Sequence, residues 1–465
     1  MTYLLEFLQV HGDKVFNESG QEVRLRGFCL GSWLNLESFM VGFPGTETEF
    51  RRAVAKVLGA EKGDYFFERF QHYFASQADF DYINSLGCNL MRVAFNYHHF
   101  EDDQKPFEYK PEGFEWLDKV ITWANSAGVY LSLDFHAFPG WQSRGWHCDN
   151  PAGGLPQFWE QVHFQDRAVA LWEALARRYK DEPAVAMYGI MNEPEARDAA
   201  QINGYYQRVT AAIRAIDRRH ILNFEGNLYS QDFSQLDPPP DRNVIYSSHL
   251  YVNAGLDDVE YPGIVNGEYF DWAALEEIYK QRRSYCVQHN IPHYISEFGP
   301  VYNDPAFVES KLQVISDYLD IIESYGDHWT IWNYKDLGKM GIVTVLPDSD
   351  WMQRIRPVHA IKTDLRADSW IDRSALEFDS HLHGFATLIQ SRLDSLPGNW
   401  RVSPEELAFL IGDRFLSGVL LPAFAEQFRD MNEAEIDTML ASFAFENCDK
   451  RTTLETIIKK YTRKE

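Results

Sequence analysis

Two glutamates stand at the ends of short apolar runs in this sequence. Glu193 follows Asn192 near the end of "AMYGIMNEP", and Glu297 lies near the end of "PHYISEFGP". A buried strand seldom ends in ionisable side chains, because burying them without partners costs free energy. Two carboxyl groups that face each other across a cleft can break a glycosidic bond. One protonates the leaving oxygen, and the other attacks the anomeric carbon or activates a water molecule.

This chemistry requires the two glutamates to differ in protonation. Arg92 lies in another apolar run, and its positive charge beside Glu297 would lower the pKa of that carboxyl and keep it ionised. We therefore expect Glu297 to act as the nucleophile and Glu193 as the general acid and then the general base. Pro194 should restrict Glu193 to an extended backbone. The alternative is that both glutamates form structural ion pairs.

Other strand ends carry polar or aromatic side chains as well. Besides the two glutamates, the predicted strand ends contain Arg92, Asp134, His136, Asn192, Glu225, His249, Tyr251, Trp332, Lys335 and Asp336. A structural core does not need hydrogen-bonding groups at so many successive strand ends, whereas an active site does. We therefore favour one shared functional site over isolated ion pairs.

The elements that would position these side chains alternate along the chain. Apolar runs typical of strands lie at residues 23–30, 90–95, 129–136, 184–194, 220–226, 243–251, 292–300 and 328–336, and stretches with helical spacing separate them. Eight such repeats predict an α/β fold, a (β/α)8 TIM barrel. An open doubly wound sheet is the alternative, but "GSWLNLES" follows the first strand where that fold would have a glycine-rich phosphate turn.

Three connections are longer than a compact domain usually needs. They cover residues 31–74, 137–156 and 252–269, after the first, third and sixth strands. In a barrel, these loops lie on the face where barrel enzymes have their active sites. Glu37, Trp141 and His147 in these loops, and Asp336 after the last strand, are therefore further candidates for substrate contacts.

The pattern changes at about residue 369. We predict a catalytic barrel with long loops over residues 1–368 and an all-helical appendage over residues 369–465. The appendage would pack on the barrel or mediate self-association, so a homo-oligomer is one expected state.

The composition limits the partners and the compartment. The 465-residue chain has a formal charge of −25, which argues against nucleic acid and anionic membranes. Its five cysteines show no C-x-x-C spacing, and the sequence shows neither a signal peptide nor a transmembrane run. We therefore expect free thiols and a cytoplasmic location. The histidines of "YHHF" and "GWHCDN" lack metal-ligand spacing, so we expect neither a metal nor a cofactor.

The strand ends resemble glycoside hydrolase family 5, the cellulase-like family of retaining barrel glycosidases. The segments that carry the resemblance are "GCNLMRV", "DFH", "MNEP", "HLY", "ISEFG" and "WTIWNYKD", which lie within residues 27–336 and do not reach the appendage. The resemblance implies double displacement through a covalent glycosyl-enzyme, with Glu193 as acid/base and Glu297 as nucleophile.

The resemblance also implies roles for the neighbouring residues. Asn192 would bind the 2-hydroxyl of the reacting sugar, and Trp332 would form the floor of that subsite. Arg92 and Tyr251 would hold Glu297. His136 and His249 would line the reacting subsite, so a carbohydrate is the expected partner.

The bulky, aromatic loops favour a pocket over an open groove, and no secretion signal is visible. We therefore expect short β-linked oligosaccharides or glycosides of gluco or manno configuration as substrates. One alternative is an endo-acting β-glucanase or mannanase that cuts polymers, and another is a carbohydrate-binding barrel without catalysis. A barrel aldolase or isomerase would need a Schiff-base lysine or a metal cluster at the strand ends.

Overall fold

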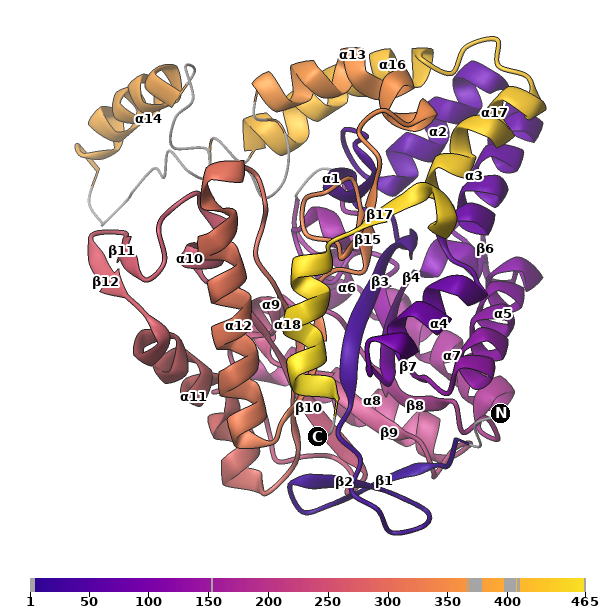
Figure 1. Ribbon diagram of the computed structural model, residues 1–465, viewed down its shortest axis with the longest axis vertical. Helices are drawn as coiled ribbons and strands as arrows, with labels where there is room; N and C mark the ends of the chain where they lie inside the picture. The colour runs from indigo at the N-terminus through magenta and orange to yellow at the C-terminus, as the bar shows by residue number, and fades with distance from the viewer. Residues whose placement is uncertain are drawn as a thin grey trace.

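Eight parallel strands close into a barrel in the computed structural model (Figure 1). The structure describes residues 5–151, 154–365, 367, 379–396, 407 and 410–463. The barrel strands are β3 (Arg26–Leu34), β4 (Leu90–Asn96), β7 (Tyr130–Ala137), β8 (Val185–Gly189), β9 (Ile221–Glu225), β10 (Val244–Leu250), β13 (His293–Phe298) and β14 (His328–Ile331). All eight predicted strands form, and the (β/α)8 barrel is confirmed over the open sheet.

Long helices surround the barrel. They are α4 (Gln77–Ser85), α5 (Pro111–Ala127), α7 (Val162–Tyr179), α8 (Ala199–Arg214), α11 (Trp272–His289), α12 (Val308–Tyr325) and α13 (Asp350–Asp364). α5 ends at Gly128, which adopts the left-handed backbone conformation that stops a helix, as the sequence predicts. The apolar faces of the helices and the outer faces of the strands form one continuous hydrophobic core.

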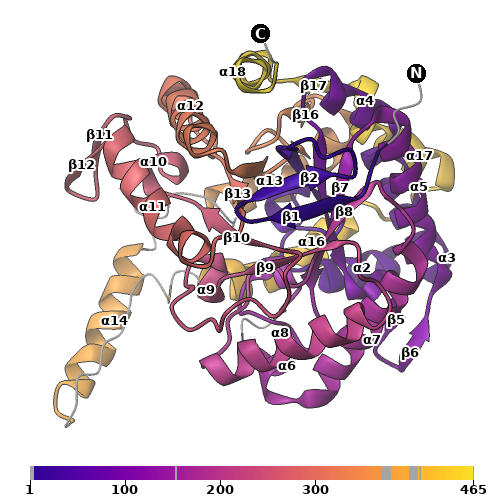
Figure 2. The same ribbon diagram turned by 90° about the horizontal axis from the view of Figure 1, so that it is seen from below.

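A short hairpin closes one end of the barrel. β1 (Leu8–His11) pairs with β2 (Lys14–Asn17), and Figure 2 shows this hairpin across the barrel end when the molecule is seen from below. Leu8 and Val15 of the hairpin pack with apolar side chains from the strand starts, including Leu90 and Ile245. This end is therefore filled by a dry core, and the polar strand ends lie at the other end.

The long connections contain elements of their own. After β3 come α1 (Ser38–Val41), α2 (Glu47–Leu58) and α3 (Ala60–Phe74); after β4, η1 (Tyr97–His99), β5 (Glu101–Asp102) and β6 (Lys105–Tyr109); after β7, η2 (Trp146–Cys148) and α6 (Gln157–Glu160). α9 (Asn227–Ser230) follows β9; α10 (Asn253–Leu256), β11 (Gly263–Val265) and β12 (Glu268–Phe270) follow β10; and η3 (Pro305–Phe307) follows β13. Because all of them leave the carboxyl ends of parallel strands, they gather on one face.

The described part of the C-terminal region is helical apart from one short strand. It contains α14 (Asp379–Leu393), η4 (Leu410–Leu416), α16 (Ser417–Glu426), α17 (Glu433–Leu440), η5 (Ala441–Phe443), η6 (Phe445–Asn447), β17 (Cys448–Lys450) and α18 (Thr452–Thr462). β17 joins β15 (Lys335–Asp336) and β16 (Val343–Val345) in a small sheet. A strand of three residues is too short to show a periodic pattern in the sequence. The predicted boundary at residues 368 and 369 lies outside the described residues.

The C-terminal helices pack on the helices inserted after the first strand, α16 on α2 and α17 on α3. Phe428 lies between Phe66 of α3 and Trp351 of α13, with ring centroids 5.1 and 5.7 Å away. The buried Nζ of Lys335 binds the carboxylate of Asp79 at 2.7 Å and the backbone carbonyl of Phe443 at 3.1 Å. We propose that the barrel (residues 1–368) and the appendage (residues 369–465) unfold as one cooperative unit.

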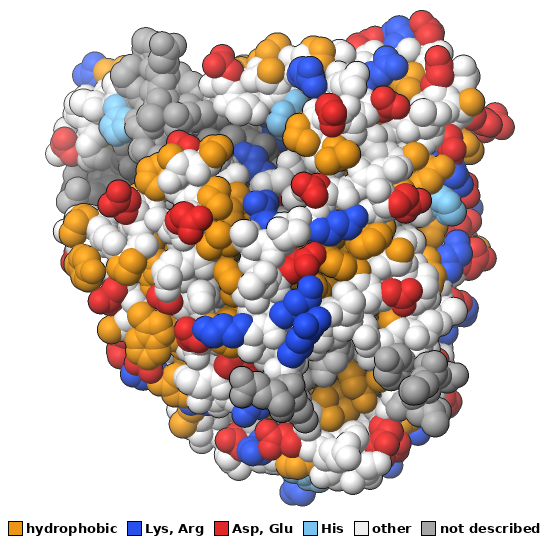
Figure 3. Space-filling model, viewed as in Figure 1, with side chains coloured by type: hydrophobic (Ala, Val, Ile, Leu, Met, Phe, Trp, Pro, Cys, Tyr) orange, Lys and Arg blue, Asp and Glu red, His pale blue; other side chains and the backbone are white. Residues whose placement is uncertain are grey.

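The outer surface carries charges of both signs. On the face shown in Figure 3, acidic side chains are dispersed and Lys and Arg side chains lie among them. All five cysteines are buried and none is in a disulfide bond, as expected from the sequence. Among the described residues, we find no helix with the length and apolar character needed to cross a bilayer.

Replacing Phe428 by Ala tests the proposed cooperative unit. The change leaves a cavity between the appendage and the barrel insertion, so the free energy of unfolding should fall by about 3–5 kcal/mol. Denaturant titration followed by both tryptophan fluorescence and activity measures this change. The two signals should disappear in one transition. As a control, Phe385→Ala alters a side chain that is 52% exposed and should change stability by less than about 0.5 kcal/mol.

Candidate active site

The two glutamates predicted from the sequence share one cavity at the carboxyl ends of the strands. Glu193 follows β8, and Glu297 lies on β13. One oxygen of each carboxylate and a ring nitrogen of His249 lie within 4.8 Å of one another. Retaining double displacement requires carboxyl groups roughly 5–5.5 Å apart, whereas inversion requires roughly 6.5–9.5 Å. The arrangement therefore has the spacing of a retaining pair.

The cavity has a volume of about 370 Å³. Besides the two glutamates, it is lined by Glu37, His136, Gly145, Trp146, His147, Tyr229, Gln231, Tyr251, Leu256 and Trp332. These residues come from strand ends and from the loops after the first, third, fifth, sixth and eighth strands. All three long connections therefore contribute to its walls.

Glu297 is held by three side chains. Nη1 of Arg92 lies 2.5 Å from its Oε1, and the Tyr251 hydroxyl donates to its Oε2 at 2.9 Å. Nδ1 of His249 lies 3.4 Å from Oε2. These donors fix the carboxylate in one position, and positioning of this kind is what a nucleophile requires.

Arg92 is fully buried and connects several strands. Its Nη2 lies 2.7 Å from Oδ1 of Asn192, 3.0 Å from Asp134 and 3.3 Å from Glu225. Since Glu297 binds the other end of the guanidinium, one side chain of β4 orients polar groups from β7, β9, β13 and the end of β8. The guanidinium also places a positive charge among these buried acids, which opposes part of the rise in the pKa of Glu297 that burial causes.

Glu193 is bound by two histidines and has a left-handed backbone. Nδ1 of His249 lies 2.6 Å from its Oε1, and Nε2 of His147 lies 3.1 Å from its Oε2. Its φ is +45°, so the extended backbone predicted from Pro194 is wrong. The Glu193 N–H donates to Oε2 of Glu225 at 2.8 Å, which stabilises a backbone conformation that is otherwise unfavourable.

The protonation of the pair differs from the expectation based on Arg92. Burial and the negative charge of Glu193 raise the pKa of Glu297. The positive charges of His249 and Arg92 offset this rise only in part, so the expectation of a lowered pKa is wrong. Burial alone would raise the pKa of Glu193. The effects of His147 and His249 outweigh burial and lower this pKa to about 2. Burial lowers the pKa of His249, yet the surrounding carboxylates raise it well above its usual value. The proton on the Glu193–His249 hydrogen bond therefore resides on the imidazole.

The other residues expected to bind the sugar gather on one side of the pair. His136 stacks on Trp332 with ring centroids 5.3 Å apart, and its Nε2 lies 3.3 Å from Nδ2 of Asn192. Glu37 is 3% exposed and accepts a hydrogen bond from Nε1 of Trp146 at 3.3 Å. The loops after the first and third strands therefore meet at this side of the cavity, which we call the glycone side (Glu37, His136, Trp146 and Trp332).

Five predicted site residues are not among those that line the cavity: Arg92, Asn192, His249, Trp141 and Asp336. Arg92 and His249 are buried and contact the two glutamates, and Asn192 binds Arg92. Trp141 lies in the loop after β7 but is not among the lining residues. Asp336 is buried and accepts hydrogen bonds from the backbone N–H groups of Gly338, Met340 and Gly341 at 2.7, 2.7 and 3.0 Å. Asp336 therefore holds the turn that follows it.

The lining residues that the sequence analysis does not identify include Gly145, Tyr229, Gln231 and Leu256. Tyr229 and Gln231 follow β9 within a few residues, and Leu256 ends the helix α10. The position of Tyr229 four residues after Glu225 is the signal that points to it. The sequence does not reveal how the loop folds, because Leu, Tyr and Ser do not favour the positive φ that residues 228–230 adopt.

Within the described part of the chain, one group of side chains is close enough to share a cation. It consists of Glu193, His249 and Glu297. Their hydrogen bonds to one another and to Arg92 already neutralise much of their charge. Glycoside hydrolysis by two carboxylates uses these groups directly. The cluster therefore has the groups that acid–base and nucleophilic chemistry requires.

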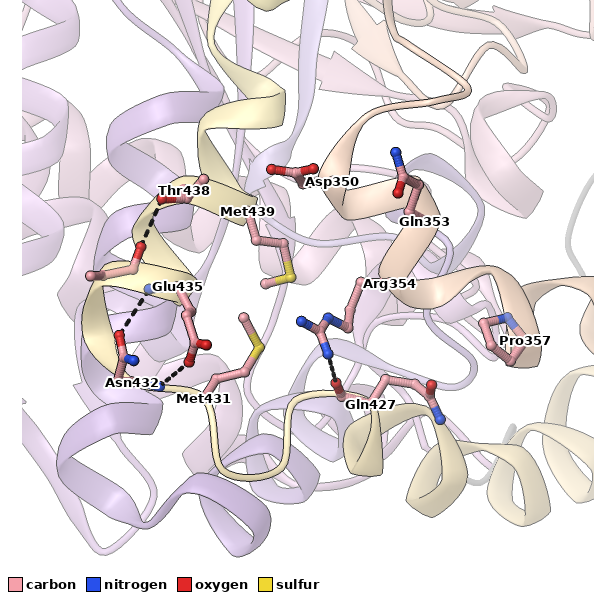
Figure 4. Close-up of a pocket in the computed structure, with 11 residues that line it drawn as sticks. Asp350, Gln353, Arg354, Pro357, Gln427, Met431, Asn432, Glu435, Thr438 and Met439 are labelled. Atoms are coloured by element: carbon pink, nitrogen blue, oxygen red, sulfur yellow. Dashed lines mark hydrogen bonds between the residues drawn. The ribbon is translucent and has the colours of Figure 1, made fainter.

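A second cavity, of about 690 Å³, lies between α13 and α17 (Figure 4). Arg354 of α13 donates to the backbone carbonyl of Gln427 at 3.3 Å, and the side chains of Met431 and Met439 point toward each other beside it. The residues that line this cavity include none of the predicted site residues. It is therefore separate from the catalytic pair.

Comparison with known proteins identifies relatives over most of the chain. The family model described as "Cellulase (glycosyl hydrolase family 5)" matches residues 41–338. A β-xylosidase from Phanerodontia chrysosporium is 36% identical over 475 aligned positions that cover 98% of this chain and 98% of the relative. Endoglucanase C from Acetivibrio thermocellus is 24% identical and covers 57% of this chain and 85% of that protein.

Solved structures share the barrel. Endoglucanase Cel5A from Thermotoga maritima matches with a TM-score of 0.51 and 20% identity, over 68% of this chain and 91% of that chain. Another structure of Cel5A is a complex with mannotriose. An endogalactoceramidase matches with a TM-score of 0.53 and 18% identity, over 71% of this chain and 75% of that chain. At these identities the likeness concerns the fold.

Replacing Tyr251 by Phe removes the hydroxyl that donates to Glu297. A hydrogen bond to a charged group contributes about 1.5–3 kcal/mol, so kcat/KM should fall about 10–100-fold. This hydrogen bond favours the ionised carboxylate, and its loss therefore raises the pKa of Glu297. Because the nucleophile must be ionised, the acidic limb of the pH–activity profile should move to higher pH.

Tyr205 of α8 provides the matched control. It is also buried, but its ring packs against Phe138 and Phe158 instead of a catalytic side chain. Tyr205→Phe should leave the pH profile in place. An acidic limb that does not move in Tyr251→Phe would contradict the contact assigned to Glu297.

Proposed function

The chain belongs to glycoside hydrolase family 5, and we propose that it removes a terminal sugar from short β-linked oligosaccharides or β-glycosides with retention of configuration. Membership of the family makes it a glycosidase. The observation that carries the finer proposal is the hydrogen bond between Trp146 and Glu37, which joins two loops across one side of a cavity of about 370 Å³. A cavity closed on one side favours a chain end over the middle of a polymer.

In the proposed first half-reaction, Glu297 attacks the anomeric carbon. The bond from that carbon to the glycosidic oxygen breaks, and Glu193 delivers a proton to the oxygen. His249 supplies this proton, because its Nδ1 lies 2.6 Å from the Glu193 carboxylate. The proton moves from Nδ1 to that carboxylate and on to the departing oxygen, which leaves His249 neutral until the second half-reaction returns a proton through Glu193. Arg92 and Tyr251 meanwhile keep Glu297 in position for attack.

In the second half-reaction, a water molecule attacks the same carbon of the glycosyl-enzyme. Glu193 takes a proton from this water, and the bond between the anomeric carbon and Glu297 breaks. Two displacements at one carbon restore the β configuration. The loss of negative charge on Glu297 in the intermediate removes an interaction that would favour protonated Glu193, so Glu193 can act as a base.

The glycone side carries groups suited to hydroxyl recognition. We assign Asn192 to the 2-hydroxyl and Trp332 to the floor under the sugar ring, with His136 and His249 lining the same subsite. Glu37 is suited to a second hydroxyl of the terminal sugar because its carboxylate is an acceptor. The relative named a β-xylosidase adds the xylo configuration to the gluco and manno configurations expected from the sequence.

Endo action on a polymer is the second candidate function. The relatives named endoglucanases favour it, although they cover less of this chain than the β-xylosidase does. A binding protein without catalysis is disfavoured, because both glutamates are present at retaining distance.

Alanine at the two glutamates tests the assigned roles with an aryl β-glycoside. Glu193→Ala should slow deglycosylation by about 10²–10⁴-fold, because general acid–base help is lost. Added azide should then restore turnover and yield a β-glycosyl azide, since azide needs no general base. Glu297→Ala should lose activity by on the order of 10⁴-fold or more and should not form the β-azide. Full activity in both variants would overturn the assignment.

A polymer assay tests the proposed attack on chain ends. Wild-type protein should release single sugars from oligosaccharides and lower the viscosity of a soluble β-glucan or β-mannan only slowly. Viscosity and reducing ends measured together distinguish the two modes of action. A rapid fall in viscosity with few reducing ends would favour the endo alternative.

A further inference from the structure

The loop after β9 contains an unusual backbone conformation. Leu228, Tyr229 and Ser230 have φ values of +51°, +58° and +61°, which form a left-handed turn made of non-glycine residues. Side chains of this kind disfavour the left-handed region because Cβ approaches the following carbonyl oxygen. Such strain persists only where the surroundings hold it, and it is concentrated at functional sites. We call this segment (residues 228–230) the left-handed turn.

One end of the left-handed turn is anchored to Glu225, which binds the Glu193 backbone, and the residue before the turn is anchored to the loop that contains Glu193. The Ser230 hydroxyl donates to Oε2 of Glu225, the same oxygen that accepts the N–H of Glu193. Asn227, just before the turn, exchanges two hydrogen bonds of 2.9 Å with the backbone of Ala196. The loops that follow β8 and β9 are therefore tied together around the acid/base.

The turn places the ring of Tyr229 in the catalytic cavity. Its ring centroid lies 6.1 Å from that of His147 in an edge-to-face arrangement, and His147 in turn contacts Glu193. The backbone N–H of Tyr229 lies 3.4 Å from the Pro194 carbonyl, and its hydroxyl lies 3.4 Å from Glu195. Tyr229 is therefore fixed on the side of the acid/base.

Two groups of barrel strands, with the loops that follow them, form the two sides of the cavity. The glycone side is built by the eighth, first and third strands and their loops, whereas Tyr229, Gln231 and Leu256 come from the loops after the fifth and sixth strands. Because Glu193 must protonate the oxygen of the departing group, that group lies on the Tyr229 side.

The chemistry of the two sides differs. On the glycone side, Oε1 of Glu37 lies 3.3 Å from His136 and receives no aligned hydrogen bond from any described residue, so it can accept one from a hydroxyl. On the other side, Oε1 of Gln231 is bound by Arg282 at 2.7 Å, and the Tyr229 hydroxyl is directed to Glu195. The Tyr229 ring and Leu256 supply the apolar surface on that side.

We propose that Tyr229 is the platform of a leaving-group subsite that takes an apolar aryl or alkyl aglycone. This inference rests on the proposed function and names the substrate class of that site. The Tyr229 ring offers a flat face, and Leu256 offers an aliphatic contact. The groups that can bind hydroxyls, such as Glu37, lie on the glycone side and would bind the sugar. The enzyme thereby selects β-glycosides of aryl or alkyl alcohols over disaccharides of the same sugar.

Tyr229→Gly removes the ring and suits the positive φ of this position, because glycine adopts a positive φ freely. The test compares two substrates that carry the same sugar. One is a naphthyl β-glycoside, and the other is the β-glycosyl fluoride, whose leaving group is a single atom. We expect the ratio of their kcat/KM values to fall about tenfold in the variant, as loss of an aromatic contact predicts. Tyr229→Phe keeps the ring and should keep the ratio.

Tyr269 on β12 is the matched surface control, since it is 63% exposed and lies outside the cavity. Tyr269→Ala should change neither the ratio nor the melting temperature. An unchanged ratio in Tyr229→Gly overturns this inference alone, provided that wild-type protein cleaves both substrates. Wild-type protein that cleaves neither substrate overturns the proposed function as well.

Discussion

The site depends on one buried cation. Arg92 lies within hydrogen-bonding or ion-pair distance of Glu297, Asp134 and Glu225 and is itself fully buried. Carboxylates this close together cannot all remain ionised in a dry interior without a positive charge among them. Because these carboxylates come from different strands, the guanidinium contacts all of them only when the barrel is closed in register. The closed barrel and the charged site therefore require each other.

Much of the fold and the catalytic pair can be predicted from the sequence. Strand periodicity identifies the eight strands, and parallel strands in a barrel bring their carboxyl ends together, so Glu193 and Glu297 can be paired although they are far apart in the chain. The backbone of Glu193 and the position of Tyr229 could not be predicted, because positive φ values at these residue types depend on tertiary hydrogen bonds. The pKa values of the pair also depend on burial and on histidines that only the folded structure brings near.

A group of catalytic residue types is not sufficient to define a site in this barrel. The Ser248 hydroxyl lies 2.9 Å from His293, whose other ring nitrogen lies 3.0 Å from Asp327. This order resembles the triad of a serine hydrolase, yet all three side chains are buried and Arg283 also binds Asp327. Side chains alternate along a strand, so Ser248 points to the opposite face from its neighbour His249, which contacts the catalytic pair. Position at the cavity distinguishes the functional cluster from the structural one.

In the proposed mechanism, Glu297 forms a covalent bond to the sugar. A 2-deoxy-2-fluoro β-glycoside with a good leaving group slows both displacements and deglycosylation most, so the intermediate accumulates. Mass spectrometry of the inactivated protein and its peptides is the most direct measurement. We expect one added fluoro-sugar per chain, attached to the peptide that contains Glu297. Attachment to a different residue, or turnover with inverted configuration and no adduct, would contradict it.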